Sequence, residues 1–154
     1  MFDESAFLAT NYNEAGSTRM PVVPEGSGWI GVSKKLGFRE FEFQDKDTGN
    51  MKKVMIMTVT WEVEDPKFME IAGRKTLTVG QEFWLDLKAD KKTLDFGPGK
   101  NMKLSQLREE YGQNGTETWN PKFLLGKSAM LDVSHRTGSN GETYASVTRA
   151  KKIQ

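Results

Sequence analysis

The chain has 154 residues, with 22 lysines and arginines against 21 aspartates and glutamates, one histidine and no cysteine. A length near 150 suits one compact domain, which buries about two-thirds of the surface that the unfolded chain exposes. The absence of cysteine excludes disulfides, thiolate nucleophiles and cysteine-containing zinc sites, and one histidine cannot build a histidine-rich metal site. No uncharged apolar run approaches the roughly 18 residues of a membrane span, so we expect no membrane partner.

Residues 1–27 differ in pattern from the rest of the chain. They show little hydrophobic periodicity and end in a stretch rich in proline and glycine, which neither a helix nor a central strand tolerates. They carry one arginine against four carboxylates, whereas residues 121–154 carry six lysines and arginines against two carboxylates. We predict an extended, acidic N-terminal arm over 1–27 and a folded domain over 28–154.

The first strand-like pattern follows the arm. Residues 29–32 open it and residues 38–43 continue it, with Gly37 between them at a point where a strand can bend or bulge. Phe41 and Phe43 fall on one face, because alternate side chains of a strand point to the same side. We expect at least one of these two phenylalanines to be buried.

Two more strands follow a turn. Residues 45–50 have the composition of a hairpin turn, and residues 51–63 alternate so that one face is wholly apolar. Trp61 lies on that apolar face, so we predict that it is a core residue. Residues 74–79 and 82–88 are also strand-like and together predict a third strand.

One helix and two last strands complete the pattern. Leucines and a tyrosine recur at helical spacing, which predicts a helix that begins after Asn101 and ends near Gly112. Residues 124–134 and 143–149 alternate as two strands, and residues 138–141 have the composition of the hairpin turn between them.

Five strands with one helix between the third and the fourth follow the order of an OB-fold. This fold is a small Greek-key barrel whose exposed face binds oligonucleotides or oligosaccharides. We therefore predict an all-β domain with one short helix, a five-stranded OB-fold-like barrel with an extended N-terminal arm. An SH3-like barrel or a β-sandwich would show similar periodicity, but neither requires a helix in that position.

Signatures of enzymes are incomplete. Gly126-Lys127-Ser128 resembles the end of a phosphate-binding loop, but Pro121 stands where the first glycine of that motif belongs. No serine lies in a nucleophile elbow. His135 precedes a polar hairpin turn, where a solvated side chain is the simpler interpretation. We therefore predict a non-catalytic protein with no cofactor and no metal.

The remaining chemical signal is a set of aromatic side chains interleaved with lysines and arginines. Single-stranded nucleic acids are bound by stacking bases on aromatic rings, at about 1–3 kcal/mol per base, while cationic side chains follow the phosphates. The predicted nucleic-acid-binding residues are Lys35, Arg39, Phe41, Lys52, Lys53, Arg74, Lys75, Trp84, Lys88, Trp119 and Tyr144.

Several of these positions have a second interpretation. Trp84 points away from the apolar face of its strand, so it is either a stacking platform or part of a second small core beneath the arm. Trp119 lies in a polar loop, either as a stacking platform or as an anchor of that loop. The cationic side chains form a groove if the first hairpin brings its two strands together and Arg74 and Lys75 reach the same edge.

Four stretches carry a family resemblance. They are the Pro-Val-Val-Pro-Glu-Gly entry to the first strand, the hairpin over 49–62, the helix over 103–108, and the closing hairpin with Phe-Leu-Leu-Gly-Lys at 123–127 and Asn-Gly-Glu-Thr-Tyr-Ala-Ser-Val at 140–147. Through this pattern, most of residues 21–152 resembles the small single-stranded DNA-binding proteins of tailed bacteriophages, a divergent OB-fold group.

The resemblance implies non-catalytic binding of single-stranded DNA during replication or recombination, in the cytoplasm of an infected bacterium. It also implies replication or recombination proteins as partners, and it leaves a homodimer open. One departure is the basic ending from Arg149, because many members end in an acidic tail that recruits partners. The alternatives are a phage structural or assembly protein whose aromatic face is a protein interface, and a carbohydrate-binding barrel with Trp84 and Trp119 as sugar platforms.

Overall fold

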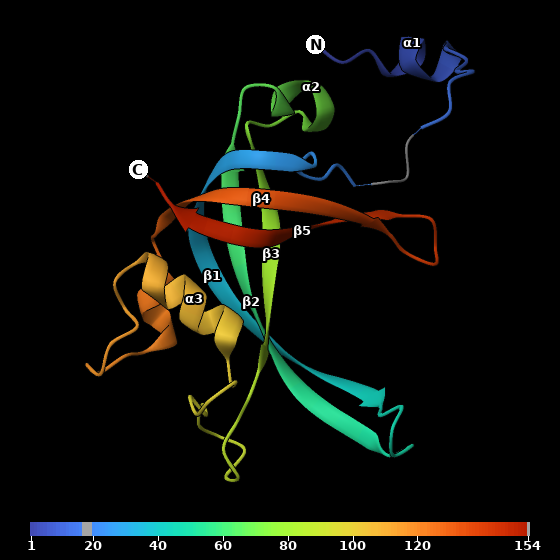
Figure 1. Cartoon of the computed structure of the whole chain (residues 1–154). Coiled ribbons are helices and arrows are strands. Elements are labelled where there is room, and N and C mark those ends of the chain that lie inside the picture. The colour runs from blue at the N-terminus through green and yellow to red at the C-terminus, as the bar shows by residue number, and fades with distance from the viewer. Residues whose placement is uncertain (17–19, 154) are drawn as a thin grey trace.

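The computed structural model describes residues 1–16 and 20–153. Five strands form one sheet that closes into a barrel in the order β1-β2-β3-β5-β4, with β4 paired to β1 (Figure 1). The predicted all-β, five-stranded barrel is therefore confirmed. The strands are β1 (Gly26–Gln44), β2 (Met51–Glu64), β3 (Thr76–Leu85), β4 (Ser128–Thr137) and β5 (Thr143–Lys152). The described helical segments are α1 (Glu4–Ala9), α2 (Phe68–Ala72), α3 (Met102–Glu110) and the 3-10 turn η1 (Pro121–Leu124).

β1 is one continuous strand that serves two neighbours. Its first residues pair with β4, and from Gly31 onward it pairs with β2. The irregularity expected at Gly37 lies instead between Ser33 and Lys35, where the register shifts against β2. A bulge there bends the strand and increases its twist, which lets β1 leave one neighbour and follow the other.

The core fills the barrel and follows the alternation predicted for the second strand. Met57, Val59, Trp61 and Val63 point inward from β2 and are buried, so the prediction of Trp61 as a core residue is confirmed. The indole Nε1–H of Trp61 donates to Gln81 Oε1 at 3.1 Å, which satisfies its one polar group. The other strands and α3 contribute Leu77, Val79, Phe83, Leu104, Leu107, Ala129, Leu131, Val133 and Val147.

β3 and β5 form the weakest join of the barrel. Only Gly80 and Ser146 pair between these two parallel strands, whereas β2 and β3 are paired from Met55 to Glu64. α3 lies across this join, with Leu104 and Leu107 buried against the core (Figure 1). The seam between β3 and β5 is therefore closed by a helix rather than by a ladder of hydrogen bonds.

The helices differ from the single one predicted. α3 confirms the helix expected between the third and fourth strands, and Gly112 follows it with a φ of 67°. α1 forms within the arm that was expected to be extended, and Asp3 Oδ1 caps it by accepting from the N–H of Ala6 at 3.1 Å. α2 and η1 form where no helix was predicted, and β4 begins at Ser128 rather than at the predicted residue 124. Helical segments this short contain too few apolar repeats for a periodic pattern to reveal them.

The last residues of the arm, from Val23 to Glu25, pack on the barrel. Val23 is fully buried, and its carbonyl oxygen lies 2.6 Å from His135 Nε2. Glu25 Oε2 accepts a hydrogen bond from the backbone N–H of His135 at 2.8 Å. The interpretation of His135 as a solvated turn residue is therefore wrong, because its ring and its backbone both hold the arm against β4.

Candidate nucleic-acid interface

Three aromatic rings meet on the outer face of β1 and β3. The ring centroids of Phe41 and Trp84 are 5.6 Å apart, those of Phe43 and Trp84 are 5.9 Å apart, and Phe41 stacks on Phe43 at 6.1 Å. We call these three residues the aromatic patch. Trp84 follows the two phenylalanines by more than 40 positions in the chain, so the patch exists only because β2 pairs with both β1 and β3.

The register of the sheet explains the patch. Arg39 of β1 and Trp84 of β3 both lie opposite Ile56 of β2, so all three side chains share one face. β3 ends at Leu85, one residue after Trp84. β1 and β2 continue past this point as a two-stranded hairpin that extends from the barrel (Figure 1). Phe41 and Phe43 occupy the hairpin rows next to Trp84, opposite Val54 and Lys52.

The patch is exposed to solvent but rests on a buried base. Trp84 is 52% exposed and Phe41 is 37% exposed, whereas Ile56 beneath them is fully buried. Trp84 is therefore not part of a core covered by the N-terminal arm. Phe43 is only half-buried, so the expectation that one of the two phenylalanines is buried is wrong. The reason is that β3 pairs with β2 only as far as Met55, so no third strand lies beside the part of the hairpin that carries Phe41 and Phe43.

Charged groups beside the patch are partly paired. Arg39 Nη2 lies 3.2 Å from Glu82 Oε1, and its guanidinium carbon lies 5.7 Å from the centroid of Phe41. At the hairpin tip, Lys52 forms an ion pair and hydrogen bond with Asp45, which lowers the pKa of that carboxyl. Lys53 lies opposite Glu42, on the other face of the hairpin from Lys52.

The remaining predicted cations are dispersed along the sheet. Lys35 is exposed and pairs with Thr60, and Lys88 is exposed just after β3. Arg74 and Lys75 precede β3 at the end opposite to Trp84, which ten residues of extended chain place about 30 Å away. The prediction that they join one basic cluster is wrong, because antiparallel pairing puts the start of β3 beside the end of β2.

Trp119 anchors its loop and does not join the patch. Its Nε1–H donates to Gln113 Oε1 at 2.9 Å, and the guanidinium carbon of Arg108 lies 4.3 Å from its ring centroid. Arg108 is buried between this ring and that of Phe96, at 4.6 Å from the latter. Burial lowers the pKa of Arg108. Sequence reasoning missed this cation, because eleven residues separate it from the tryptophan.

Tyr144 is exposed on β5 but lies apart from the patch. Its hydroxyl accepts from Asn140 Nδ2 at 3.0 Å, and the guanidinium carbon of Arg136 lies 5.4 Å from its ring centroid. Because Ser146 is level with Gly80 in the parallel pair, Tyr144 is about 20 Å along the sheet from Trp84.

Comparison with known protein families, characterised proteins and solved structures finds no match for this chain. Function is therefore inferred from the geometry of the barrel. Over residues 1–16 and 20–153, no helix is long and apolar enough to cross a membrane. Within the same ranges, no three histidine, aspartate or glutamate side chains gather closely enough to hold a metal ion.

A hollow of about 410 Å³ opens beside Trp84, between the end of β3 and the start of α3. Phe83, Trp84 and Met102 are among its apolar lining residues, and its charged lining residues are Glu82, Asp86 and Lys103. Sequence reasoning did not find it, because no pattern along the chain places α3 next to the last residues of β3.

Proposed function

We propose that the protein binds single-stranded DNA without sequence preference and without catalysis, on an OB-fold barrel. The supporting features of the fold are the strand order β1-β2-β3-β5-β4 and the position of α3 between β3 and β4. OB-folds bind oligonucleotides on the face of their second and third strands, between the first and the last hairpin loops. The aromatic patch lies on this face, next to the first hairpin.

The exposed aromatic patch is the observation that carries the proposal. Aromatic rings that remain in solvent on a rigid sheet offer stacking surfaces to bases of any identity. Phe41, Phe43 and Trp84 provide such a surface. Arg39 and Lys52 lie on the same face, each paired with a carboxylate that a phosphate would have to replace. Protection of single strands during phage DNA replication or recombination is the role that the family resemblance suggests.

Tryptophan fluorescence tests this proposal directly. We expect oligo-dT of about 12 nucleotides to quench the emission, and the affinity to fall steeply between about 50 and 200 mM salt, as phosphate contacts require. A Trp84→Phe variant should still bind a labelled oligonucleotide while losing most of the quenching. The proposal is wrong if neither quenching nor anisotropy detects a salt-sensitive complex at low ionic strength, or if an oligosaccharide displaces the DNA.

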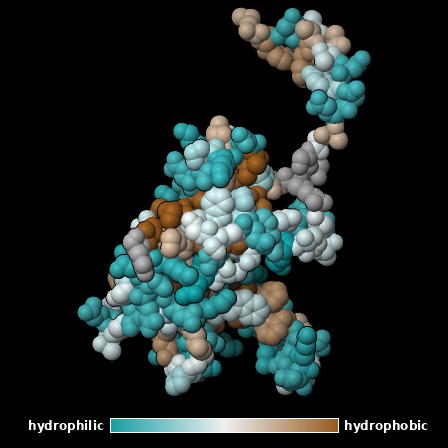
Figure 2. All heavy atoms as spheres, turned by 45° about the horizontal axis from the view of Figure 1, so that its top comes forward, coloured by the Kyte–Doolittle hydropathy of each residue, from teal (hydrophilic) through white to brown (hydrophobic). Residues whose placement is uncertain are grey.

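A second candidate function is assembly with another protein, and the N-terminal arm favours it. Phe2, Phe7, Leu8 and Tyr12 are exposed on or beside α1, with the rings of Phe2 and Phe7 5.2 Å apart. Figure 2 shows hydrophobic side chains gathered on the N-terminal segment. Short apolar helices dock into grooves of partner proteins. This candidate would be supported over the first if the protein sediments as a large assembly and its sedimentation coefficient does not change when DNA is added.

A further inference from the structure

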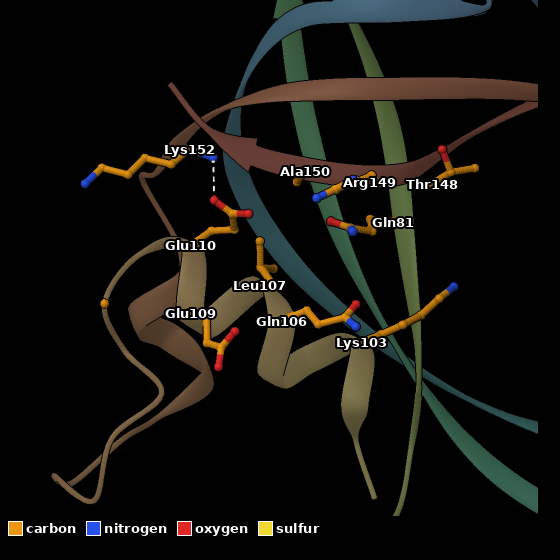
Figure 3. Close-up of a pocket in the computed structure, with 11 residues that line it drawn as sticks. Gln81, Lys103, Gln106, Leu107, Glu109, Glu110, Thr148, Arg149, Ala150 and Lys152 are labelled. Atoms are coloured by element: carbon orange, nitrogen blue, oxygen red, sulfur yellow. Dashed lines mark hydrogen bonds between the residues drawn. The ribbon is translucent and has the colours of Figure 1, made fainter. Parts of the chain in front are cut away.

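A second, larger hollow lies on the other side of Lys103. It occupies about 800 Å³ between α3 and the seam of β3 and β5, as Figure 3 shows. The two strands are joined there by the single pair Gly80 and Ser146, so beyond this pair the backbones are free to diverge and α3 spans the space. Its walls include Gln81, Lys103, Gln106 and Arg149.

Gln81 presents a hydrogen-bond donor to this hollow. The residue is only 8% exposed, and its Oε1 is fixed by the indole N–H of Trp61, so the amide nitrogen Nε2 must face the other way. Nε2 donates to no other group in residues 1–16 and 20–153. Since no fully buried side-chain nitrogen in those ranges lacks a partner, Nε2 reaches the open space of the hollow.

Three cations, Lys103, Arg149 and Lys152, and two carboxylates, Glu109 and Glu110, line the same space. Neither Lys103 nor Arg149 forms an ion pair within the described residues. Of the two nearby carboxylates, Glu110 is engaged by the backbone N–H of Lys152 at 3.0 Å, and Glu109 is directed away from Gln81 and Arg149 (Figure 3). A donor that is nine-tenths buried between two unpaired cations suits an anionic ligand.

Lys103 connects the two hollows. It lines both the space beside Trp84 and the space beside Gln81, because it lies in the first turn of α3 where the helix passes the end of β3. A chain that stacks a base on Trp84 therefore meets Lys103 next and then Gln81 and Arg149. The repeating anion of single-stranded DNA is the phosphodiester, which accepts from cationic and amide donors alike.

On the basis of the proposed function, we infer that single-stranded DNA continues from the aromatic patch along α3 into the second, larger hollow. Lys103 and Arg149 contact successive phosphates, and Gln81 Nε2 donates to a phosphate oxygen. We call the path from Trp84 past Lys103 to Arg149 the α3 trough. Bases bind at the patch, and the trough extends the site for longer strands.

Oligonucleotide length separates the trough from the patch. We compare Lys103→Gln/Arg149→Gln with the unaltered protein, using labelled oligo-dT of about 4 and about 12 nucleotides, the two lengths lying within the range that one OB-fold covers. The longer strand should bind roughly tenfold more weakly to the double variant, whereas the short strand, which reaches Lys103 but not Arg149, should be weakened less. The slope of log affinity against log salt should fall by about 1.4 for the longer strand, at 0.7 for each lost phosphate contact.

Arg74→Gln/Lys75→Gln is the matched control. It removes the same two charges at the opposite end of β3, so it should bind both lengths as the unaltered protein does. The trough is excluded if the control loses as much affinity as the double variant, if short and long strands weaken equally, or if neither changes. If the unaltered protein binds no DNA of either length, the proposed function fails and the trough fails with it. Thermal melting verifies that both variants fold.

Discussion

Asp86 and Asn101 exchange three hydrogen bonds across the loop that joins β3 to α3. The N–H of Asp86 donates to Asn101 Oδ1 at 2.9 Å, the N–H of Asn101 donates to Asp86 Oδ2 at 2.7 Å, and Asn101 Nδ2 donates to the carbonyl oxygen of Asp86 at 2.8 Å. Nδ2 also donates to the carbonyl of Asp95 at 2.8 Å. This linkage holds the first turn of α3 beside Trp84, so it builds both hollows of the candidate site.

Replacing Asn101 with glycine tests the linkage without straining the backbone. Asn101 has a φ of 49°, in the left-handed region that glycine adopts freely. The substitution therefore removes the three hydrogen bonds of the Asn101 side chain, two to the backbone of Asp86 and one to the carbonyl of Asp95, and leaves the bond from the Asn101 N–H to Asp86 Oδ2. At about 0.5–1.5 kcal/mol each, the free energy of unfolding should fall by about 1.5–4.5 kcal/mol in urea denaturation. Asn114→Gly, at an exposed position with one hydrogen bond of 3.4 Å, should change it by far less. Equal losses in the two variants would argue against the linkage.

Trp84→Ala should weaken binding of single-stranded DNA by about 1–3 kcal/mol, the value of one stacked base, and leave the fold intact. This corresponds to roughly 5- to 150-fold in affinity, measured by anisotropy of a labelled oligonucleotide. Tyr144→Ala removes an exposed ring about 20 Å along the sheet and should have little effect. If Trp84→Ala instead melts early and its folded fraction binds normally, the indole serves to cover Ile56.

Features that depend on the residue pattern within one segment were predicted correctly from the sequence. Alternation over β2 identified both the strand and its buried face, because the in-and-out period of a strand is a local property. The same reasoning placed Trp61 in the core, as the structure confirms, and directed Trp84 to the opposite face, but it left open whether a second small core covers Trp84. The helix between the third and fourth strands was likewise predicted from spacing within one segment.

Features that require register between distant segments could not be read from the sequence. Phe41 and Trp84 meet because both lie on rows set by β2, and no local pattern states which residues of two strands are level. Arg74 and Lys75 were assigned to the wrong end of the sheet for the same reason. Gln81 lies between the strand-like stretches 74–79 and 82–88, so no pattern singled it out, whereas in the structure it is part of β3 and lines the α3 trough.

Gly31 and Gly37 of β1 should respond differently to alanine. A Cβ at Gly31 would lie 2.6 Å from Leu131 Cδ1, and Leu131 is fully buried, so the core must shift. Overpacking of this kind costs about 1–3 kcal/mol. A Cβ at Gly37 meets nothing within 4 Å. We expect the Tm to fall for Gly31→Ala and to remain unchanged or rise slightly for Gly37→Ala; the reverse order would contradict the register of β1 against β4.

The stability of the barrel should fall at high pH through Tyr111. Burial, with a smaller contribution from the charge of Glu110, raises the pKa of Tyr111 to about 12 from its ordinary value of 10.0. The folded state therefore holds the phenolic proton more tightly than the unfolded state does. This contribution is fully present below pH 10 and is lost as the pH rises through about 12. Tyr111→Phe should show a shallower decline of unfolding free energy between about pH 9 and 12, and identical slopes would exclude the effect.

Two truncations divide the N-terminal arm into a free part and a packed part. Removing residues 1–16 should leave the urea midpoint unchanged, because every one of these residues is exposed. Removing residues 1–25 also deletes Val23, which is fully buried, and Glu25, which accepts from His135. Burial of one valine contributes about 1.5–3 kcal/mol, so this longer truncation should destabilise the barrel by at least that amount.

Sedimentation of the shorter truncation tests whether the arm joins copies of the chain. If the arm mediates assembly with another copy, removing residues 1–16 converts the assembly to monomers. A sedimentation coefficient that is unchanged apart from the lost mass means that Phe2, Phe7 and Leu8 make no contact between copies.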